Sequence, residues 1–448
     1  MKAVSITTRY RVIVPDVSET CFLALPARDG WSLPGWSIDG APAWEDASTV
    51  NAGIKESLGL RVTMLRATAR DWTETRRDSY YLVENLDPAW QPEHGARWIP
   101  KDEAETLRWA NSREAAQIQE WVAGQASPTR VPWYSPGWFD TVERWIASAL
   151  RQAGIASDRG VEQLRSWERC SLFRVTTRDG DVYFKAVPPQ WGHEPALTDY
   201  LSTRFPGRVP APIAVDPGRG YLLMRDFGGG PVTGITDLAI WSEAYAELAR
   251  MQKALVSDVE GLRRLGVPYQ PPAEIQPRIG AMIRDERRMR FGMGRGLSRE
   301  GIDSLQQAEV LFAAACKRLA HGPIPLSLDH GDFWPGNIQS TPDGPILFDW
   351  SDATITHPFF SLVMAADEID ACFPEITGAG DTVVEAYLDE WTEYASPAEL
   401  RAIFDDAMLI APLYLSLMYR DHYLPAMEFP DELDRMTPHF LRWLVGRL

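Results

Sequence analysis

The sequence predicts an α+β protein in which a strand-rich part precedes a helical part. In residues 1–124, short apolar runs typical of strands are mixed with two or three short helical patterns. Two further strand-like runs, 173–177 and 182–187, flank an Asp-Gly pair, which supplies the positive backbone angle that a tight hairpin needs. Beyond Pro210, apolar residues recur at helical spacing. Because 448 residues exceed one ordinary hydrophobic core, we expect two or three domains.

The first domain is predicted to span residues 1–124 and to be an α+β unit. Its expected strands are 10–14, 21–25, 61–65 and 80–83. Residues 125–137 concentrate Gly, Ser and Pro, which disfavour regular structure, so we expect a linker there.

The rest of the chain is predicted to form a β-rich lobe, 138–230, and a larger helical lobe, 231–448. The β-rich lobe begins with a helical pattern and continues with the hairpin. In the helical lobe, Asp237 can cap a helix that extends to about Leu255. A short apolar run, 345–348, ends at Asp349, so we expect this carboxylate at the end of a strand.

Composition excludes several classes of function. A formal net charge of −17 would repel nucleic acid and anionic membranes, whereas it would attract a cationic small molecule. The four cysteines form no Cys-x-x-Cys pair, which argues against a metal knuckle or a disulfide framework. Residues 1–15 lack the apolar core of a signal peptide, and the longest apolar run, 408–418, is shorter than the roughly 20 residues that span a bilayer. We therefore expect a cytoplasmic protein in which residues 408–418 form a buried helix.

Oxygen-bearing side chains that lie close together in the sequence are the candidate catalytic and metal-binding residues. The segment HGDFWPGN, residues 330–337, brings Asp332 and Asn337 into one loop, and the strand that ends at Asp349 follows a predicted turn at Asp343-Gly344. Magnesium prefers carboxylate and amide oxygens, so Asn337 and Asp349 suit it. Asp332 then remains to meet an acceptor hydroxyl, as phosphoryl transfer requires.

This run resembles the catalytic loop of the aminoglycoside phosphotransferase and choline kinase family, whose pattern is His-Gly-Asp, four residues, Asn, and a later Asp-Trp or Asp-Phe. The resemblance implies a two-lobed protein-kinase-like fold. It also implies that Asp332 is the catalytic base, that Asn337 and Asp349 bind Mg²⁺, that His330 braces the loop, and that Trp350 packs beneath it.

The same resemblance implies a nucleotide site for ATP. Lys185, at the end of a hairpin strand, and Glu194, before a helical run, are expected to pair and to reach the phosphates. Met224 and Asp226 follow an apolar strand where adenine would lie against the hinge. The segment 166–171 replaces a glycine-rich loop, so the hydroxyls of its two serines are candidates for the phosphate contact: Ser166 and Ser171.

Three features depart from the family pattern or imitate another one. The triplet Asp226-Phe227-Gly228 precedes the catalytic loop, so we interpret it as a hinge turn and not as a metal-binding triplet. The run GMGRG, 292–296, has a misplaced third glycine and is not expected to bind a dinucleotide. Ser361 stands where the family pattern has an aspartate after His-Pro, so we expect a bracing contact to be lost.

The first domain resembles a Nudix domain whose signature motif is incomplete. The run WSLPG, 31–35, followed by GIKESLGL, 53–60, has the form of the Nudix box, a helix whose glutamates hold metal around a diphosphate. Ala52 and Gly53 stand where the box requires Arg-Glu, and Ser57 replaces a second glutamate. We therefore expect no metal cluster here, and a structural or substrate-gating domain.

The function expected from the sequence is ATP- and Mg²⁺-dependent phosphorylation of a hydroxyl on a small molecule, such as an aminoglycoside, an amino sugar or choline. Two alternatives remain open. One is a catalytically idle nucleotide-binding scaffold, and the other is an enzyme that modifies a protein presented by the Nudix-like domain. The sequence indicates no oligomeric state, and it leaves the acceptor unspecified.

Overall fold

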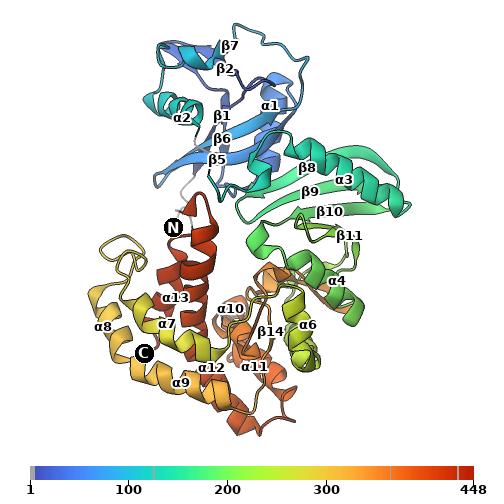
Figure 1. Cartoon of the computed structure of the whole chain (residues 1–448), viewed down its shortest axis with the longest axis vertical. Coiled ribbons are helices and arrows are strands. Elements are labelled where there is room, and N and C mark those ends of the chain that lie inside the picture. Colours follow the sequence, from blue (N-terminus) through green and yellow to red (C-terminus); the bar gives the residue numbers. More distant parts are fainter. Residues whose placement is uncertain (1–5, 125–126, 364, 431–432) are drawn as a thin grey trace. The chain divides into compact units, whose positions relative to one another are not determined.

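The computed structural model describes residues 6–124, 127–363, 365–430 and 433–448 (Figure 1). The chain divides into two compact units, Met1–Pro188 and Pro189–Leu448. The first unit holds most of the long strands, and the second holds most of the helices. This confirms the predicted α+β class with a β-rich part followed by a helical part.

The N-terminal part of the first unit contains two small sheets and two helices. A mixed sheet has the order β4-β1-β6-β5, in which β1 and β6 run parallel, and a second sheet has the order β3-β2-β7. All four predicted strands are present and are longer than expected. The elements are β1 Thr7–Ile13, β2 Cys21–Ala27, β3 Gly30–Ser32, β4 Gly35–Asp39, α1 Ala47–Leu58, β5 Val62–Trp72, β6 Arg76–Asn85, β7 Arg97–Pro100 and α2 Ser112–Ala123.

The rest of the first unit is a helix and three antiparallel strands. Helix α3, Trp138–Gln152, precedes β8 Ser157–Trp167, β9 Cys170–Thr177 and β10 Gly180–Ala186. Thr177 pairs with Gly180 across the predicted turn, and Gly180 has a φ of 112°, so the hairpin is confirmed. Residues 125 and 126 of the expected linker lie outside the described residues. Its later part is not extended, because Pro132–Tyr134 forms a 3₁₀ turn with Trp133 and Tyr134 buried.

The second unit is mainly helical. Asp237 caps α5 as expected, because its carboxylate accepts a hydrogen bond from the Ala239 amide at 3.0 Å. The helices are α4 Glu194–Arg204, α5 Leu238–Leu255, α6 Val259–Arg264, α7 Pro272–Ile283, α8 Arg299–Gln307, α9 Glu309–His321, α10 Ala365–Cys372, α11 Ala379–Asp389, α12 Pro397–Met418 and α13 Met436–Val445. The strands are β11 Pro212–Asp216, β12 Tyr221–Arg225, β13 Gly230–Pro231, β14 Ser327–Asp329, β15 Ile338–Thr341, β16 Gly344–Leu347 and β17 Thr354–Thr356.

Helix α12 contains the apolar run 408–418. With its continuation, Pro397–Ala426, it is long and apolar enough to cross a membrane by length and composition. However, 56% of its most apolar stretch is buried inside the fold, and Ile410, Leu413 and Leu417 are almost fully enclosed. The expectation of a buried core helix is therefore confirmed.

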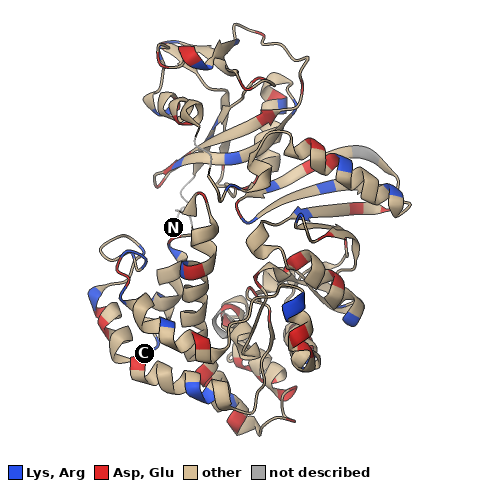
Figure 2. Ribbon diagram, viewed as in Figure 1, with Lys and Arg blue, Asp and Glu red and all other residues tan. Residues whose placement is uncertain are grey.

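Charged side chains of both signs are mixed along the helices of the second unit (Figure 2). Many of them form ion pairs at the surface, such as Arg318 with Asp406 at 2.6 Å and Arg401 with Asp381 at 2.9 Å. Exposed pairs of this kind each contribute little to stability.

Candidate active site

The catalytic-loop segment begins with a sharp turn at Gly331. Its φ is 77°, and a Cβ atom built on this residue would lie 2.1 Å from the carbonyl oxygen of Asp352. Only glycine satisfies both the left-handed backbone and the close approach. The turn takes the chain out of the buried strand β14, and the next residue, Asp332, is exposed.

Asn337 is fixed by its contacts with Asp332. Its side-chain nitrogen donates to the backbone oxygen of Asp332 at 2.9 Å and lies 3.3 Å from the Oδ2 atom of the same residue. Asn337 is buried in the 3₁₀ turn Pro335–Asn337. Because the amide nitrogen is bound to Asp332, the amide oxygen is left for another contact, and its predicted role as a metal ligand stays a prediction.

The β15–β16 hairpin brings Asn337 and Asp349 to the same end. Ile338 pairs with Leu347, and the Phe348 amide donates to the Asn337 carbonyl at 3.2 Å. Asp349 therefore follows directly after the residue opposite Asn337. It has a left-handed backbone, with φ 65° and ψ 64°, and its Oδ1 accepts a hydrogen bond from the Ser351 hydroxyl at 2.9 Å. Strand β16 ends at Leu347, two residues before Asp349, so the expectation that Asp349 lies at the end of a strand is confirmed.

His330 and Trp350 form a buried layer behind the loop. The His330 Nε2 atom lies 3.0 Å from the Phe348 carbonyl oxygen, and its ring centroid is 4.5 Å from that of Trp350. Burial lowers the pKa of His330 to about 4, so the ring is neutral at pH 7 and its Nε2–H donates. His330 thus ties the loop to the strand that precedes Asp349.

The expected loss of a bracing contact at Ser361 is wrong. The Ser361 hydroxyl donates to Asp329 Oδ1 and accepts from the His330 amide at 3.2 Å and from the Gln252 side chain at 3.1 Å. Asp329 is fully buried, and desolvation raises its pKa to about 7. In this contact, the carboxylate belongs to Asp329 on β14, before the loop, and the hydroxyl belongs to Ser361, in the segment after His357. The sequence analysis missed Asp329, which directly follows apolar Leu328.

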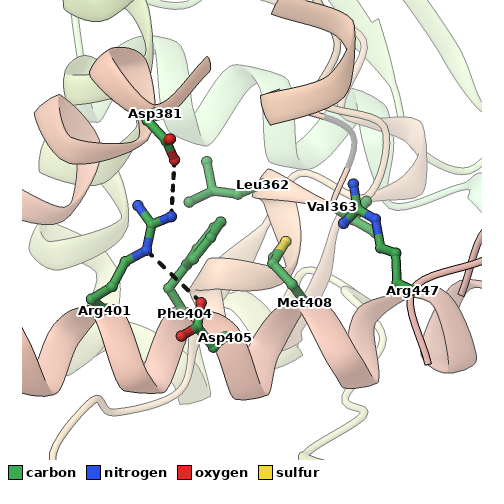
Figure 3. Close-up of a pocket in the computed structure, with 8 residues that line it drawn as sticks. All are labelled: Leu362, Val363, Asp381, Arg401, Phe404, Asp405, Met408 and Arg447. Atoms are coloured by element: carbon green, nitrogen blue, oxygen red, sulfur yellow. Dashed lines mark hydrogen bonds and ion pairs between the residues drawn. The ribbon is translucent and has the colours of Figure 1, made fainter. Parts of the chain in front are cut away.

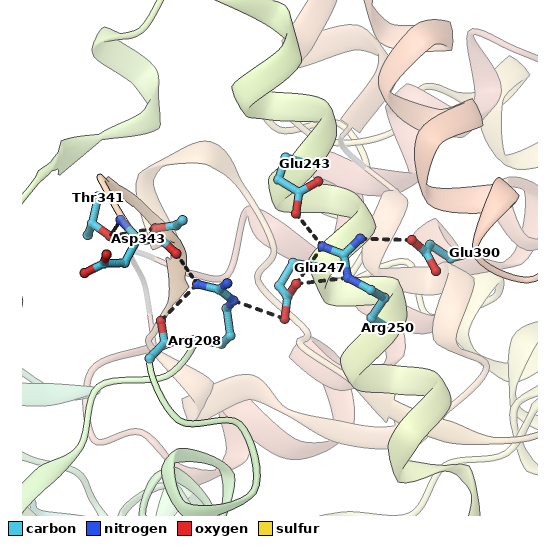
Figure 4. Close-up of polar contacts among 9 residues, drawn as sticks. Arg208, Glu243, Glu247, Arg250, Thr341, Asp343 and Glu390 are labelled. Carbon is cyan, nitrogen blue, oxygen red and sulfur yellow. Dashed lines mark hydrogen bonds and ion pairs between the residues drawn. The ribbon is translucent and has the colours of Figure 1, made fainter.

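Arg208 anchors the far end of the β15–β16 hairpin, a role the sequence analysis missed (Figure 4). Its guanidinium donates to the Asp343 carbonyl at 2.7 Å and lies 3.5 Å from Glu247 of α5. Glu247 in turn contacts Arg250, which also pairs with Glu390 at 2.9 Å. The hairpin that carries the two candidate metal ligands is thus fastened to α5.

Lys185 and Glu194 lie in different units. Lys185 is on β10, opposite Leu172 of β9, and is buried. Glu194 is the first residue of α4 and is 2% exposed. Burial of both charged side chains is typical of paired or functional groups. Their predicted pairing with each other stays a prediction.

The predicted hinge residues lie on and just after β12. Met224 is within the strand, opposite Pro212. The Asp226 carboxylate accepts from the Gly228 amide at 2.8 Å, so the Asp-Phe-Gly triplet forms a turn. The Phe227 ring lies 5.1 Å from the ring of Phe348, beside the candidate metal strand.

Ser166 and Ser171 are fully buried. The Ser166 hydroxyl donates to the Leu65 carbonyl at 2.8 Å, and the Ser171 hydroxyl lies 3.4 Å from the Arg165 carbonyl. Both hydroxyls thus make contacts inside the protein, and their predicted contact with the phosphates stays a prediction.

The donor set fits magnesium. Asn337 and Asp349 supply oxygens, and Mg²⁺ usually takes one or two carboxylates together with phosphates and water. Among the described residues, no group of three or more His, Cys, Asp or Glu side chains could hold a metal ion by itself. Nucleotide phosphates would have to complete the coordination.

A cavity of about 270 Å³ lies elsewhere in the second unit (Figure 3). Its charged lining is largely neutralised, because Arg401 pairs with Asp381 at 2.9 Å and lies 3.8 Å from Asp405. The lining consists of Leu362, Val363, Asp381, Arg401, Phe404, Asp405, Met408 and Arg447. None of these residues belongs to the loop 330–337.

Helix α1 carries the Nudix-like segment of the first domain. A Cβ atom at Gly53 would lie 2.1 Å from the indole of Trp36, which stacks on Tyr10 with 5.0 Å between centroids. An aromatic ring thus fills the space where the box has a glutamate. The Ser57 hydroxyl donates to the Gly53 carbonyl at 2.6 Å and is turned onto its own helix. The Nudix likeness itself stays a prediction.

The family of this chain is that of a phosphotransferase. Residues 160–400 match the phosphotransferase enzyme family, and the chain belongs to that family. All the candidate nucleotide, metal and catalytic residues, from Ser166 to Trp350, lie inside the matched segment.

Similar solved structures include a macrolide phosphotransferase, a choline kinase and a choline/ethanolamine kinase family protein. An apoenzyme of macrolide 2′-phosphotransferase from Brachybacterium faecium is 14% identical, with 67% of this chain and 97% of that chain covered and a TM-score of 0.44. A choline kinase from Cryptosporidium parvum is 15% identical, with 70% and 93% covered and a TM-score of 0.42. A choline/ethanolamine kinase family protein from Mesorhizobium loti is 17% identical, with 68% and 99% covered and a TM-score of 0.41. No curated protein matches the chain.

Proposed function

We propose that this phosphotransferase moves the γ-phosphoryl group of ATP to a hydroxyl of a small molecule, with Mg²⁺ as the cofactor. The observation that carries this proposal is the arrangement of Asp332, Asn337 and Asp349. An exposed carboxylate stands beside a fixed amide, and a second carboxylate lies at the same end of the hairpin.

The proposal assigns a role to each of these residues. Asp332 accepts the proton of the acceptor hydroxyl as that oxygen attacks the γ-phosphorus. Asn337 and Asp349 hold Mg²⁺, which neutralises charge on the phosphates. Lys185 binds the phosphates with Glu194 as its partner, and the backbone around Met224 and Asp226 receives the adenine.

The acceptor is proposed to be a small molecule that carries a hydroxyl group. The net charge of −17 favours a cationic acceptor such as an aminoglycoside, an amino sugar or choline. Trp334 lies two residues from Asp332 and is 43% exposed, and we propose that its ring contacts such a cation. We further propose that the enzyme acts in the cytoplasm.

The test is a Mg²⁺-dependent ATP-consumption screen against aminoglycosides, amino sugars, neutral sugars, choline and homoserine. Asp332→Ala serves as the blank, and Asp303→Ala, at an exposed position on α8, is the matched control. We expect turnover with one acceptor class, a loss of about 10²–10⁴-fold in Asp332→Ala with nucleotide binding retained, and no loss in the control.

Three other results would change the proposed function or the role of Asp332. Nucleotide binding without consumption of ATP on any acceptor would favour an idle scaffold. Phosphate incorporated into a copurifying protein would favour a protein-directed enzyme. Full turnover in Asp332→Ala would remove that residue from its role.

A further inference from the structure

The side chain of Gln163 on β8 pairs with the backbone of β5. Its oxygen accepts from the Met64 amide at 2.8 Å, and its nitrogen donates to the Met64 carbonyl at 2.9 Å. The same oxygen also accepts from the Thr63 hydroxyl at 2.9 Å and from the side-chain nitrogen of Asn51 at 3.1 Å. With 5% of its surface exposed, Gln163 makes the two bonds that a neighbouring strand would make.

Ser166 makes a second contact of the same kind. Its hydroxyl donates to the Leu65 carbonyl at 2.8 Å, and its amide donates to the Glu45 carbonyl at 3.1 Å. Arg165 also forms an isolated bridge with Asp46. Strand β8 packs against both α1 and β5 within the first unit (Figure 1).

A bulge in each strand makes these contacts possible. Residues 163 and 166 would face opposite sides of a regular strand, because successive side chains alternate. The pairing of β8 with β9 shifts between Gln163 and Arg165, so one extra residue turns Ser166 to the side of Gln163. Strand β5 has its own shift between Met64 and Arg66, at the residues that receive these contacts.

The contact between β8 and the first domain lies directly beside the β8–β9 turn. Trp167 pairs with Cys170 across this turn, and its carbonyl accepts from the Trp133 indole at 2.8 Å. The Trp167 ring meets the edge of Trp44, with 5.9 Å between centroids. The turn is thus held by the first domain on one side and by the segment that follows that domain on the other.

We propose that the first domain is a fixed part of the nucleotide site. In this proposal, Gln163 and Ser166 are positioning residues that hold the Trp167–Cys170 turn in the conformation that receives the ATP phosphates. In this proposal, a turn that contacts with the first domain hold in place does not need a glycine-rich sequence. This accounts for the absence of glycine from residues 166–171. The inference rests on the proposed function and on the expectation that residues 166–171 take the place of the glycine-rich loop.

The test compares Gln163→Met, Ser166→Ala and Glu162→Gln in the full-length chain. Glu162 is the matched control, because it is adjacent on β8 and its contact is an exposed ion pair with Arg174. We expect the Kd and KM for ATP to rise about tenfold in Gln163→Met and severalfold in Ser166→Ala. The KM for the acceptor should stay unchanged, and Glu162→Gln should match the wild type. Amide hydrogen exchange at residues 167–170 should become faster only in the first two variants.

The outcomes separate the two proposals. A wild type that does not bind ATP contradicts the proposed function. A wild type that binds ATP, together with variants that bind it equally well, overturns the role of the first domain. Equal losses for ATP and acceptor would also overturn it, because they indicate general destabilisation. If Gln163→Met does not fold, Ser166→Ala, which loses a single hydrogen bond, decides the question.

Discussion

At the residue scale, Gly331 is required by both its backbone angle and its surroundings. Gly331→Ala is expected to destabilise the fold by about 1–3 kcal/mol from strain alone, with a further cost from the contact with Asp352, and to abolish turnover. Gly207 provides a matched control, because its φ is also 77° but nothing lies within 4 Å of its Cβ position. Urea unfolding of both variants measures the difference. Equal losses would show that the contact with Asp352 has no cost.

A second residue-scale prediction concerns His357. This histidine is buried, its Nδ1 accepts from the Phe359 amide at 3.3 Å, and burial lowers its pKa to about 3. The unfolded chain, with a pKa near 6.5, therefore binds a proton that the folded chain does not. Stability is present above pH 6.5 and is lost as the pH falls toward 3.

In His357→Asn, the stability lost between pH 6.5 and 4 should shrink by up to about 1.4 kcal/mol per pH unit. Asparagine can still accept the Phe359 amide proton. Chemical denaturation at several pH values measures the slope, and pH 8 gives the reference outside the titration range. An unchanged slope would assign the acid sensitivity to other groups.

At the scale of elements, β14 and the segment after His357 are joined by the hydrogen bond between Asp329 and Ser361. This contact predicts that the two side chains can be exchanged for one another only together. Ser361→Asp places two carboxylates together, and Asp329→Ser leaves two hydroxyls, so each single change should cost about 1–3 kcal/mol and lower kcat. The double exchange restores one carboxylate and one hydroxyl. Stability and kcat should then recover in part. Strictly additive free energies would show that the two side chains do not act as a pair.

The β15–β16 hairpin provides the next prediction. In Arg208→Ala, the hairpin loses its bonds to the Asp343 carbonyl and to Glu247, so the positions of Asn337 and Asp349 become less fixed. We expect the Mg²⁺ concentration for half-maximal activity to rise about tenfold, as for the loss of a partner that orients a metal ligand. Arg219→Ala, which removes an exposed pair with Asp216, is the control. An unchanged Mg²⁺ dependence would separate Arg208 from the metal site.

The sequence predicted those elements whose cause is local. The Asp-Gly turn before β10, the cap at Asp237 and the strand just before Asp349 each depend on neighbouring residues, and the structure contains all three. Contacts between distant segments were not predictable. Gln163 meets Met64 across 99 positions, and Arg208 meets Asp343 across 135. Nothing near either residue in the sequence indicates its partner.

At the scale of the whole molecule, the acidic surface predicts how activity depends on salt. The Debye length falls from about 30 Å at 0.01 M to about 8 Å at 0.15 M ionic strength. A cationic acceptor attracted by the net charge of −17 should therefore lose kcat/KM severalfold over this range. A neutral acceptor should not. Steady-state assays with one acceptor of each kind, at constant Mg²⁺ and ATP, make the comparison. A salt-independent rate with the cation would remove steering from the account of its selectivity.

The contact between Gly53 and Trp36 limits how the first domain can evolve. No residue larger than glycine fits at position 53 by one substitution, because even a Cβ atom there would meet the indole at 2.1 Å. Trp36 would have to change first, and its stacking with Tyr10 would then be lost. Any larger side chain at position 53 therefore requires a less stable intermediate first, so Gly53 and Trp36 can change only as a pair.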